Sequence, residues 1–189
     1  MNTKVILLIC GSMNSSSKTK LLLQELSYKL KRHYSYDSEL LDLYELSLPV
    51  FDPNAGRLPM VNELAIKIER SNGLIIGSPE YHGSFTGALK NFLDYFGFDQ
   101  FTQKPTGLLA HSAGIKSGTN TLSHLRTVLR NIHANVISEQ VAISNKEYNE
   151  INELPEPLEK RMDLLLSGLD REIKKAELYE ELILKQKSF

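Results

Sequence analysis

The sequence of 189 residues has no tryptophan and only one cysteine, Cys10. A single cysteine excludes an internal disulfide and a metal site built from several thiolates, which favours a reducing compartment. The apolar run Val5–Cys10 is too short to span a bilayer and lacks the basic leader of a secretory signal. We therefore expect a cytoplasmic protein with no membrane partner.

The sequence also has no strong excess of charge of either sign. Lysine plus arginine number 22 and aspartate plus glutamate 23, which gives a formal net charge of -1. Such a chain offers no strong field to attract nucleic acid, so no nucleic-acid partner is expected. With 41% hydrophobic and 24% charged residues, the composition is typical of a folded protein, and we expect residues 1–189 to form a single domain.

The apolar segments alternate between strand-like and helix-like patterns. The run Val5–Cys10 is continuously apolar, which is typical of a central parallel strand covered on both faces. Further strands are predicted at residues 38–42, 73–77, 105–110 and 136–143. Apolar residues at helical spacing predict helices around residues 22–30, 64–68, 89–96 and 122–132. Five strands alternating with helices predict an α/β fold with a parallel, doubly wound sheet.

The last part of the chain predicts a long helix. From Pro157 to Ile183, apolar residues recur at helical spacing, with Gly168 as a possible weak point. Two roles stay open for this helix. It packs against its own sheet, or it contributes to contacts between subunits.

In a doubly wound sheet, ligands bind beyond the carboxyl ends of the strands, at the switch point between the first and third strands. In this sequence those ends lead into loops that start at Gly11, Ser78 and His111. A further loop, from Leu48 to Leu58, contains proline and glycine and is a candidate wall or lid of a pocket.

The first loop, Gly11–Thr19, runs from a buried strand into a helix. Backbone N–H groups at a helix N-terminus favour a dianion, and Ser12, Ser17, Thr19 and Lys18 would add hydroxyl donors and a positive charge. The loop matches neither G-x-x-x-x-G-K-S/T nor G-x-G-x-x-G, which favours the phosphate of a mononucleotide over ATP or a dinucleotide. A serine N-cap without a ligand remains an alternative explanation.

The second loop reads G-S-P-E-Y-H-G-S from residue 77 onward and precedes a predicted helix. Gly77 and Gly83 would let the backbone approach a flat ligand closely, and Pro79 would fix the direction of the loop. Tyr81 and His82 would form a wall for an aromatic ring. Each residue alone has an ordinary explanation as part of a surface or core, so the argument depends on the whole segment.

This segment, followed by G-A-L-K-N and Asp94, resembles the S-P-E-Y-x-G-S and G-x-L-K-N-x-x-D stretches of the NADPH-dependent FMN reductase family. The resemblance covers residues 5–143, including the Gly-Ser loop at residue 11 and the third loop at Ser112–Gly114. Within the family, the chain is most similar to the FMN-dependent azoreductases. The residues behind this second similarity are Lys104-Pro105, Gly114 to Gly118, L-S-H-L-R at 122–126 and Arg130.

The resemblance implies a flavodoxin-like, three-layer fold with strand order 2-1-3-4-5. It places the FMN phosphate in the first loop, the flavin ring against the second, and the far edge of the ring near the third. The implied cofactor-binding residues are Ser12, Asn14, Ser17, Lys18, Thr19, Pro79, Glu80, Tyr81, His82, Gly83, Ser84, Ser112, Ala113 and Gly114. The family usually has Arg at the position of Asn14 and Asn at that of Thr19, so this sequence departs twice in its phosphate loop.

The implied activity is an oxidoreductase in which the flavin, and no acid or base residue, carries the chemistry. NADPH, with NADH as the alternative, would pass a hydride to bound FMN, and a small acceptor would then take the place of the nicotinamide: an azo compound, a quinone or free flavin. The resemblance also implies a homodimer or homotetramer. One alternative is a flavodoxin-like electron carrier, although such carriers are typically acidic and have a T-x-T-G-x-T loop. Another is a flavin-binding sensor without NADPH turnover.

Two other kinds of active site are not supported by the sequence. His82, His111, His124 and His133 lie in different predicted elements without paired ligand spacing, so no metal site is predicted. The chain has no G-x-S-x-G nucleophile elbow, so its serines do not indicate a hydrolase.

Overall fold

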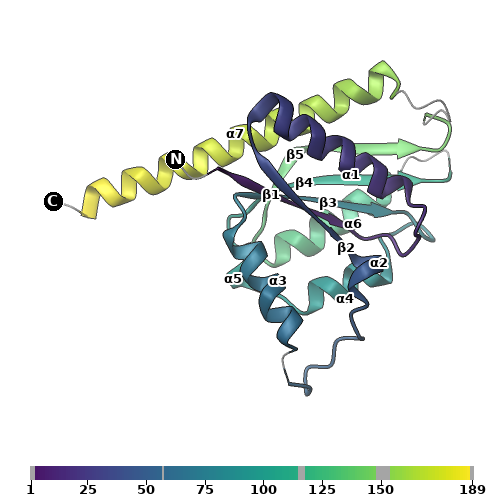
Figure 1. Cartoon of the computed structure of the whole chain (residues 1–189), viewed down its shortest axis with the longest axis horizontal. Helices are drawn as coiled ribbons and strands as arrows, with labels where there is room; N and C mark the ends of the chain where they lie inside the picture. Colours follow the sequence, from purple (N-terminus) through teal and green to yellow (C-terminus); the bar gives the residue numbers. More distant parts are fainter. Residues whose placement is uncertain (1–2, 57, 115–117, 148–153, 188–189) are drawn as a thin grey trace.

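The computed structural model describes residues 3–56, 58–114, 118–147 and 154–187. Its strands form one parallel sheet in the order β2-β1-β3-β4-β5, and Figure 1 shows their arrows pointing the same way. The strands are β1 Val5–Cys10, β2 Asp37–Asp42, β3 Gly73–Pro79, β4 Pro105–Ser112 and β5 Asn135–Ser144. This is the flavodoxin-like arrangement that was expected.

Helices cover both faces of the sheet (Figure 1). One face carries α1 (Lys18–Lys29), which continues as the π-helical turn η1 (Leu30–Tyr34), and α7 (Glu156–Lys187). The opposite face carries α3 Pro59–Arg70, α4 Gly87–Asp94 and α6 Thr119–Asn131, with the short helices α2 Leu43–Leu46 and α5 Phe98–Phe101 at its margins. The fold therefore has three layers, helix, sheet and helix.

The central strand β1 divides the core into two halves. Successive side chains of a strand point to opposite faces, so Leu7 and Ile9 pack with α3, α4 and α6, whereas Ile6 and Leu8 pack with α1 and α7. All four side chains are buried. The continuous apolar run is explained by helices on both faces, as predicted.

Two glycines have a different role from the one expected. A Cβ on Gly77, within β3, would lie 3.0 Å from side-chain atoms of both Leu23 and Thr19, so this glycine lets α1 pack closely on the sheet. A Cβ on Gly168 would lie 2.6 Å from the carboxylate of Glu139, and α7 runs through this residue without a break. Gly168 does not interrupt the helix, and its missing side chain leaves room for the side chain of Glu139 in β5.

Several boundaries differ from the prediction. Strands β3 and β4 each continue for two residues beyond the predicted end, so Ser78, Pro79, His111 and Ser112 are ladder residues rather than loop residues. The helix α4 ends at Asp94, before Phe96. The short helices α2 and α5 were not predicted, because four residues are too few to show a helical period.

The long C-terminal helix is confirmed, and its first half packs against the sheet. Leu158, Met162, Leu165, Leu169 and Ile173 are buried in the same half of the core as α1. Beyond Ile173 the helix continues past the edge of the sheet (Figure 1). None of the helices in the described part of the chain has the length and apolar character needed to cross a membrane.

The stability of the fold depends on a left-handed residue at the start of α6. Gly118 has φ +72°, and a Cβ there would lie 2.8 Å from Cβ of Ala110 in β4. We predict that Gly118→Ala lowers the free energy of unfolding by at least about 2 kcal/mol, because it combines backbone strain with a clash. Gly87→Ala is the matched control, since a Cβ at Gly87 meets nothing within 4 Å. Urea denaturation measures both variants, and equal stability of the two would contradict this account.

Candidate functional site

The three predicted loops meet at the carboxyl edge of the sheet. The Gly11 N–H donates to the Gly77 carbonyl at 2.8 Å, and the Thr86 hydroxyl donates to the Gly11 carbonyl at 2.5 Å. The Glu80 N–H donates to the His111 carbonyl at 2.8 Å. Backbone hydrogen bonds therefore connect the first loop to the second and the second to the third.

The first loop folds on its own polar side chains. Asn14 N–H donates to Ser12 Oγ at 3.2 Å, and Ser16 N–H donates to Asn14 Oδ1 at 2.9 Å. Ser17 is the N-cap of α1, and its Oγ accepts from Lys20 N–H at 3.2 Å. Ser17 therefore caps α1, and this leaves the other N–H groups of the first turn as possible donors to a ligand.

Thr19, in the first turn of α1, has a buried hydroxyl without a partner. The residue is 1% exposed, and its Oγ1 is the one buried side-chain N or O atom in the described part of the chain that makes no hydrogen bond. A buried hydroxyl left unpaired costs about 1–3 kcal/mol. An unpaired donor at a helix N-terminus is the feature expected where an anionic ligand completes the hydrogen bonding.

Asn145, which follows β5, connects the first loop to the end of β4. Its Oδ1 accepts from Lys18 Nζ at 3.1 Å and lies 2.9 Å from His111 Nε2, and its N–H donates to the Ser112 carbonyl at 3.0 Å. Burial lowers the pKa of His111, and the charge of Lys18 lowers it further, whereas the bond to Asn145 raises it. His111 is therefore neutral at pH 7, with Nε2–H directed at Asn145.

The second loop contains a tight hairpin turn. Tyr81 N–H donates to the Ser84 carbonyl at 2.9 Å, and Ser84 N–H donates back to the Tyr81 carbonyl at 3.2 Å. The two residues between them, His82 and Gly83, have φ +51° and +80°, as a type I′ turn requires. A Cβ on Gly83 would meet only Asn120, at 4.0 Å, so the left-handed backbone, rather than a lack of space, favours glycine at this position. The exposed side chains of Tyr81 and His82 lie at the turn.

Helix α6 holds the second loop at two points. The carboxylate of Glu80 accepts from Thr121 Oγ1 at 3.0 Å and from Ser112 Oγ at 3.5 Å. Ser84 Oγ lies 3.0 Å from His124 Nδ1. The carboxylate of Glu80 is thus bound to protein hydroxyls, and its contacts fix the second loop relative to the third.

The third loop turns away from the sheet at Ser112. Ser112 Oγ accepts from the Gly114 N–H at 3.0 Å, and Ala113 and Gly114 are exposed at the carboxyl edge. Residues 115–117, which belong to the Gly114 to Gly118 similarity, lie outside the described part of the chain.

The contacts also show residues that sequence reasoning missed. Asn145, Thr121 and Thr86 each bind a predicted loop from another element. Thr86 had a detectable signal, because it is the N-cap of α4 and its side chain accepts from Leu89 N–H. Asn145 and Thr121 follow no motif and are recognised only from the folded chain.

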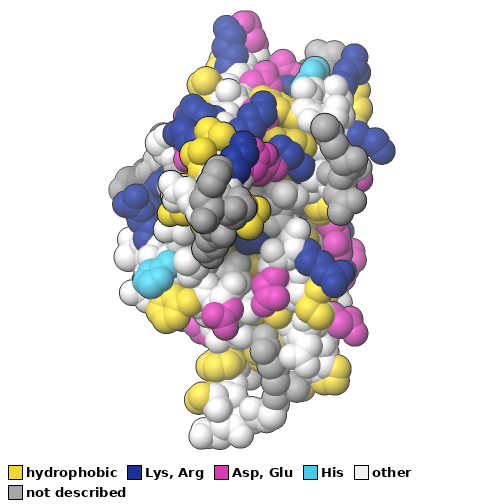
Figure 2. Space-filling model, turned by 90° about the vertical axis from the view of Figure 1, so that its left-hand side faces the viewer, with side chains coloured by type: hydrophobic (Ala, Val, Ile, Leu, Met, Phe, Trp, Pro, Cys, Tyr) yellow, Lys and Arg dark blue, Asp and Glu magenta, His cyan; other side chains and the backbone are white. Residues whose placement is uncertain are grey.

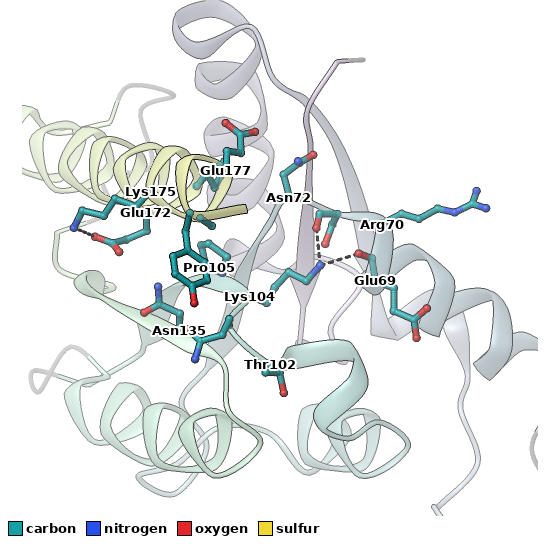
Figure 3. A pocket seen from close by; sticks show the side chains of 15 residues that line it. Glu69, Arg70, Asn72, Thr102, Lys104, Pro105, Asn135, Glu172, Lys175 and Glu177 are labelled. Carbon is teal, nitrogen blue, oxygen red and sulfur yellow. Dashed lines mark hydrogen bonds and ion pairs between the residues drawn. The ribbon is translucent and has the colours of Figure 1, made fainter. Parts of the chain in front are cut away.

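Two clefts lie away from the three loops. The loop from Leu48 to Leu58 forms one wall of a cleft of about 510 Å³, together with residues at the end of α4 and in α5. Asn91 holds this loop, because its Oδ1 accepts from Phe51 N–H at 2.7 Å and its Nδ2 donates to the Pro49 carbonyl at 2.7 Å. A second cleft, of about 840 Å³, opens between α7 and the amino edge of the sheet (Figure 3).

A family model described as NADPH-dependent FMN reductase matches residues 4–147. The chain belongs to this family of oxidoreductases. It is 36% identical over 149 residues to an FMN-dependent NADPH-azoreductase of Staphylococcus aureus, an alignment that covers 75% of this chain and 78% of the relative.

Solved structures show the same fold at lower identity. FerB, a flavoenzyme NAD(P)H:(acceptor) oxidoreductase from Paracoccus denitrificans, has a TM-score of 0.77 at 21% identity, covering 92% of this chain and 98% of FerB. An oxidoreductase from Corynebacterium diphtheriae has a TM-score of 0.78 at 19% identity, with coverage of 92% and 98%. Both support the fold assignment.

The hairpin in the second loop gives a direct test of the site. We predict that Gly83→Val disrupts the type I′ turn, because a β-branched residue strongly disfavours positive φ, and that the purified variant loses bound flavin. The loop is at the surface, so the fold should survive. Flavin content is read from visible absorbance and the fold from circular dichroism. Gly97→Val, at an extended residue with open space, is the control. Full flavin content in folded Gly83→Val would remove this loop from the site.

Proposed function

We propose that this protein is an FMN-dependent NADPH oxidoreductase that reduces a small acceptor. The observation that carries the proposal is the buried, unpaired hydroxyl of Thr19 at the N-terminus of α1, within the loop where the family resemblance puts a phosphate. Family membership supports the reaction class.

The residues of the first loop fit the phosphate group of FMN. The N-terminus of α1 supplies N–H donors and the positive end of the helix dipole, and Thr19 Oγ1 is a further donor. Lys18, at the first position of α1, supplies a formal positive charge close to the loop. The loop has Asn14 where the family usually has Arg, so we assign the charge compensation to Lys18 and the helix.

The second and third loops would hold the flavin ring. The hairpin from Tyr81 to Ser84 offers exposed side chains on a turn fixed by two backbone hydrogen bonds. The exposed backbone of Ala113 would offer its N–H group to the electron-rich edge of the ring, whereas the Gly114 N–H is bonded to Ser112 Oγ and fixes the turn of the third loop. Glu80 positions these two loops relative to each other through Thr121 and Ser112. Loops fixed in this way suit a site that must hold the flavin ring in one orientation while it is first reduced and then reoxidised.

When bound, FMN supplies the redox chemistry, taking a hydride from NADPH and passing the electrons to the acceptor. The protein would bind and orient FMN and the two substrates. We assign no catalytic acid or base among the cofactor-binding residues. We propose that NADPH and the acceptor occupy one place in turn, because the predicted loops surround a single edge of the sheet. Azo compounds, quinones and free flavin are the proposed acceptors, and the name of the Staphylococcus aureus relative supports the first of them. We also propose that one domain, residues 1–189, carries the whole activity within a homo-oligomer.

Anaerobic mixing with NADPH tests this function. FMN-loaded protein should lose its visible flavin absorbance within seconds, as expected for turnover of about 1–1000 per second, and regain it when a quinone or azo dye is added. If NADPH and the acceptor occupy the same place in turn, double-reciprocal plots of rate against NADPH concentration should give parallel lines at different acceptor concentrations. Flavin that stays oxidised with NADPH and NADH, yet is reduced by dithionite, would favour an electron carrier or a sensor instead.

Thr19→Val tests the phosphate site separately from the ring site. The variant keeps the shape of the side chain and removes the hydroxyl, so FMN should bind about tenfold or more weakly, while riboflavin, which has no phosphate, should bind as before. The apo-protein should be no less stable, because the lost hydroxyl had no partner. Titrations of both ligands measure this, with Thr127→Val on the exposed face of α6 as the control. Equal losses for FMN and riboflavin would place the phosphate elsewhere.

A further inference from the structure

Glu80, in the second loop, has no cationic partner in the described part of the chain. Its carboxylate accepts from Thr121 Oγ1 at 3.0 Å and makes a longer contact with Ser112 Oγ at 3.5 Å. Both hydroxyls belong to buried residues, and Glu80 itself is half-buried. Its negative charge is therefore partly removed from water and held there by neutral groups.

Most other carboxylates of this chain that are buried or half-buried are paired with a lysine or an arginine. Figure 2, which looks toward the C-terminal end of α7, shows basic and acidic side chains intermingled there. The paired carboxylates belong to Glu39, Asp42, Glu139, Glu147, Asp170, Glu172 and Glu177. Such pairing is expected, because a charge taken out of water needs compensation. Glu80 departs from this pattern.

The first turn of α6 stabilises the charge of Glu80. Thr121 is the third residue of this helix, and the N-cap residue Gly118 makes no side-chain hydrogen bond to it. The first turn of α6 also contains no acidic residue. The positive end of a helix dipole favours an anion at this position. The carboxylate of Glu80 therefore supplies, from another element, the negative charge that the start of α6 lacks.

The same carboxylate lies between the second and third loops. The Glu80 N–H donates to the His111 carbonyl at 2.8 Å, and the side chain of Glu80 reaches Ser112, where the third loop begins. The described parts of the two loops, residues 77–86 and 111–114, contain no lysine, no arginine and no further acidic residue. Within these stretches, no opposite charge from a lysine or an arginine offsets the charge of Glu80.

We propose that the carboxylate of Glu80 lowers the reduction potential of bound FMN. This inference rests on the proposed function, which puts the flavin ring against the second and third loops. Reduction adds negative charge to the ring, and a carboxylate in a partly buried site beside it repels that charge. The reduced form of the cofactor is destabilised relative to the oxidised form. It is therefore a stronger donor to acceptors that are hard to reduce.

Glu80→Gln separates the charge of this side chain from its hydrogen bonds. Glutamine keeps the length of the side chain and an oxygen that accepts from Thr121, but it carries no charge. In anaerobic titrations of the apo-protein, the variant should bind dithionite-reduced FMN at least about tenfold more tightly than the wild type does, with oxidised FMN little changed. A tenfold change in this ratio corresponds to about 30 mV for a two-electron couple. Spectroelectrochemical titration should therefore show the midpoint potential of bound FMN raised by at least that amount.

Two further variants are the controls. Glu63→Gln removes the same charge from an exposed position of α3, and both affinities should stay as in the wild type. Thr121→Val keeps the charge of Glu80 and removes one hydrogen bond to it, so it should weaken the binding of oxidised and reduced FMN alike.

Three results would overturn the inference. In the first, Glu80→Gln leaves the potential of bound FMN where Glu63→Gln leaves it. In the second, Glu80→Gln weakens the binding of both forms of FMN alike, which shows that the carboxylate only positions the loops. In the third, the wild-type protein binds no FMN, which contradicts the proposed function as well. The first two results leave the proposed function intact.

Discussion

The architecture depends on how the chain leaves β1 and β3. These neighbouring strands run parallel, yet the chain passes from β1 to α1 on one face and from β3 to α4 on the other. The loops must therefore separate as they leave the sheet at its carboxyl edge. The Gly11–Gly77 hydrogen bond marks where the separation begins. The first loop, the hairpin at residue 82 and the third loop are all placed by this divergence.

Most of the fold could be predicted because the central strands β1, β3 and β4 contain apolar runs between helices that cover both faces, whereas the edge strands β2 and β5 are more polar. The boundaries were less predictable where polar residues continue a ladder. His111 and Ser112 look like loop residues, yet they pair with Ile143 and Ser144 of β5. A residue with a polar side chain at the end of a strand can still form backbone hydrogen bonds to the next strand. The pattern of polar and apolar residues does not show which backbone groups are paired.

The candidate site was predictable as a set of loops but not as a set of contacts. The two glycines of the second loop illustrate why, since Gly77 makes room for Leu23 of α1 whereas Gly83 provides a left-handed backbone. The same residue type serves packing in one case and conformation in the other. Contacts such as that between Thr121 and Glu80 join residues far apart in the chain, and only the folded structure brings them together.

Asn145 joins the first loop to His111 through a single amide oxygen. The positive charge of Lys18 is one of the causes that lower the pKa of His111. An anion that neutralises Lys18, or draws its ammonium away from Asn145, removes this repulsion and so raises the pKa of His111. We therefore expect anion binding in the first loop and proton binding at His111 to favour each other, each becoming tighter when the other is present.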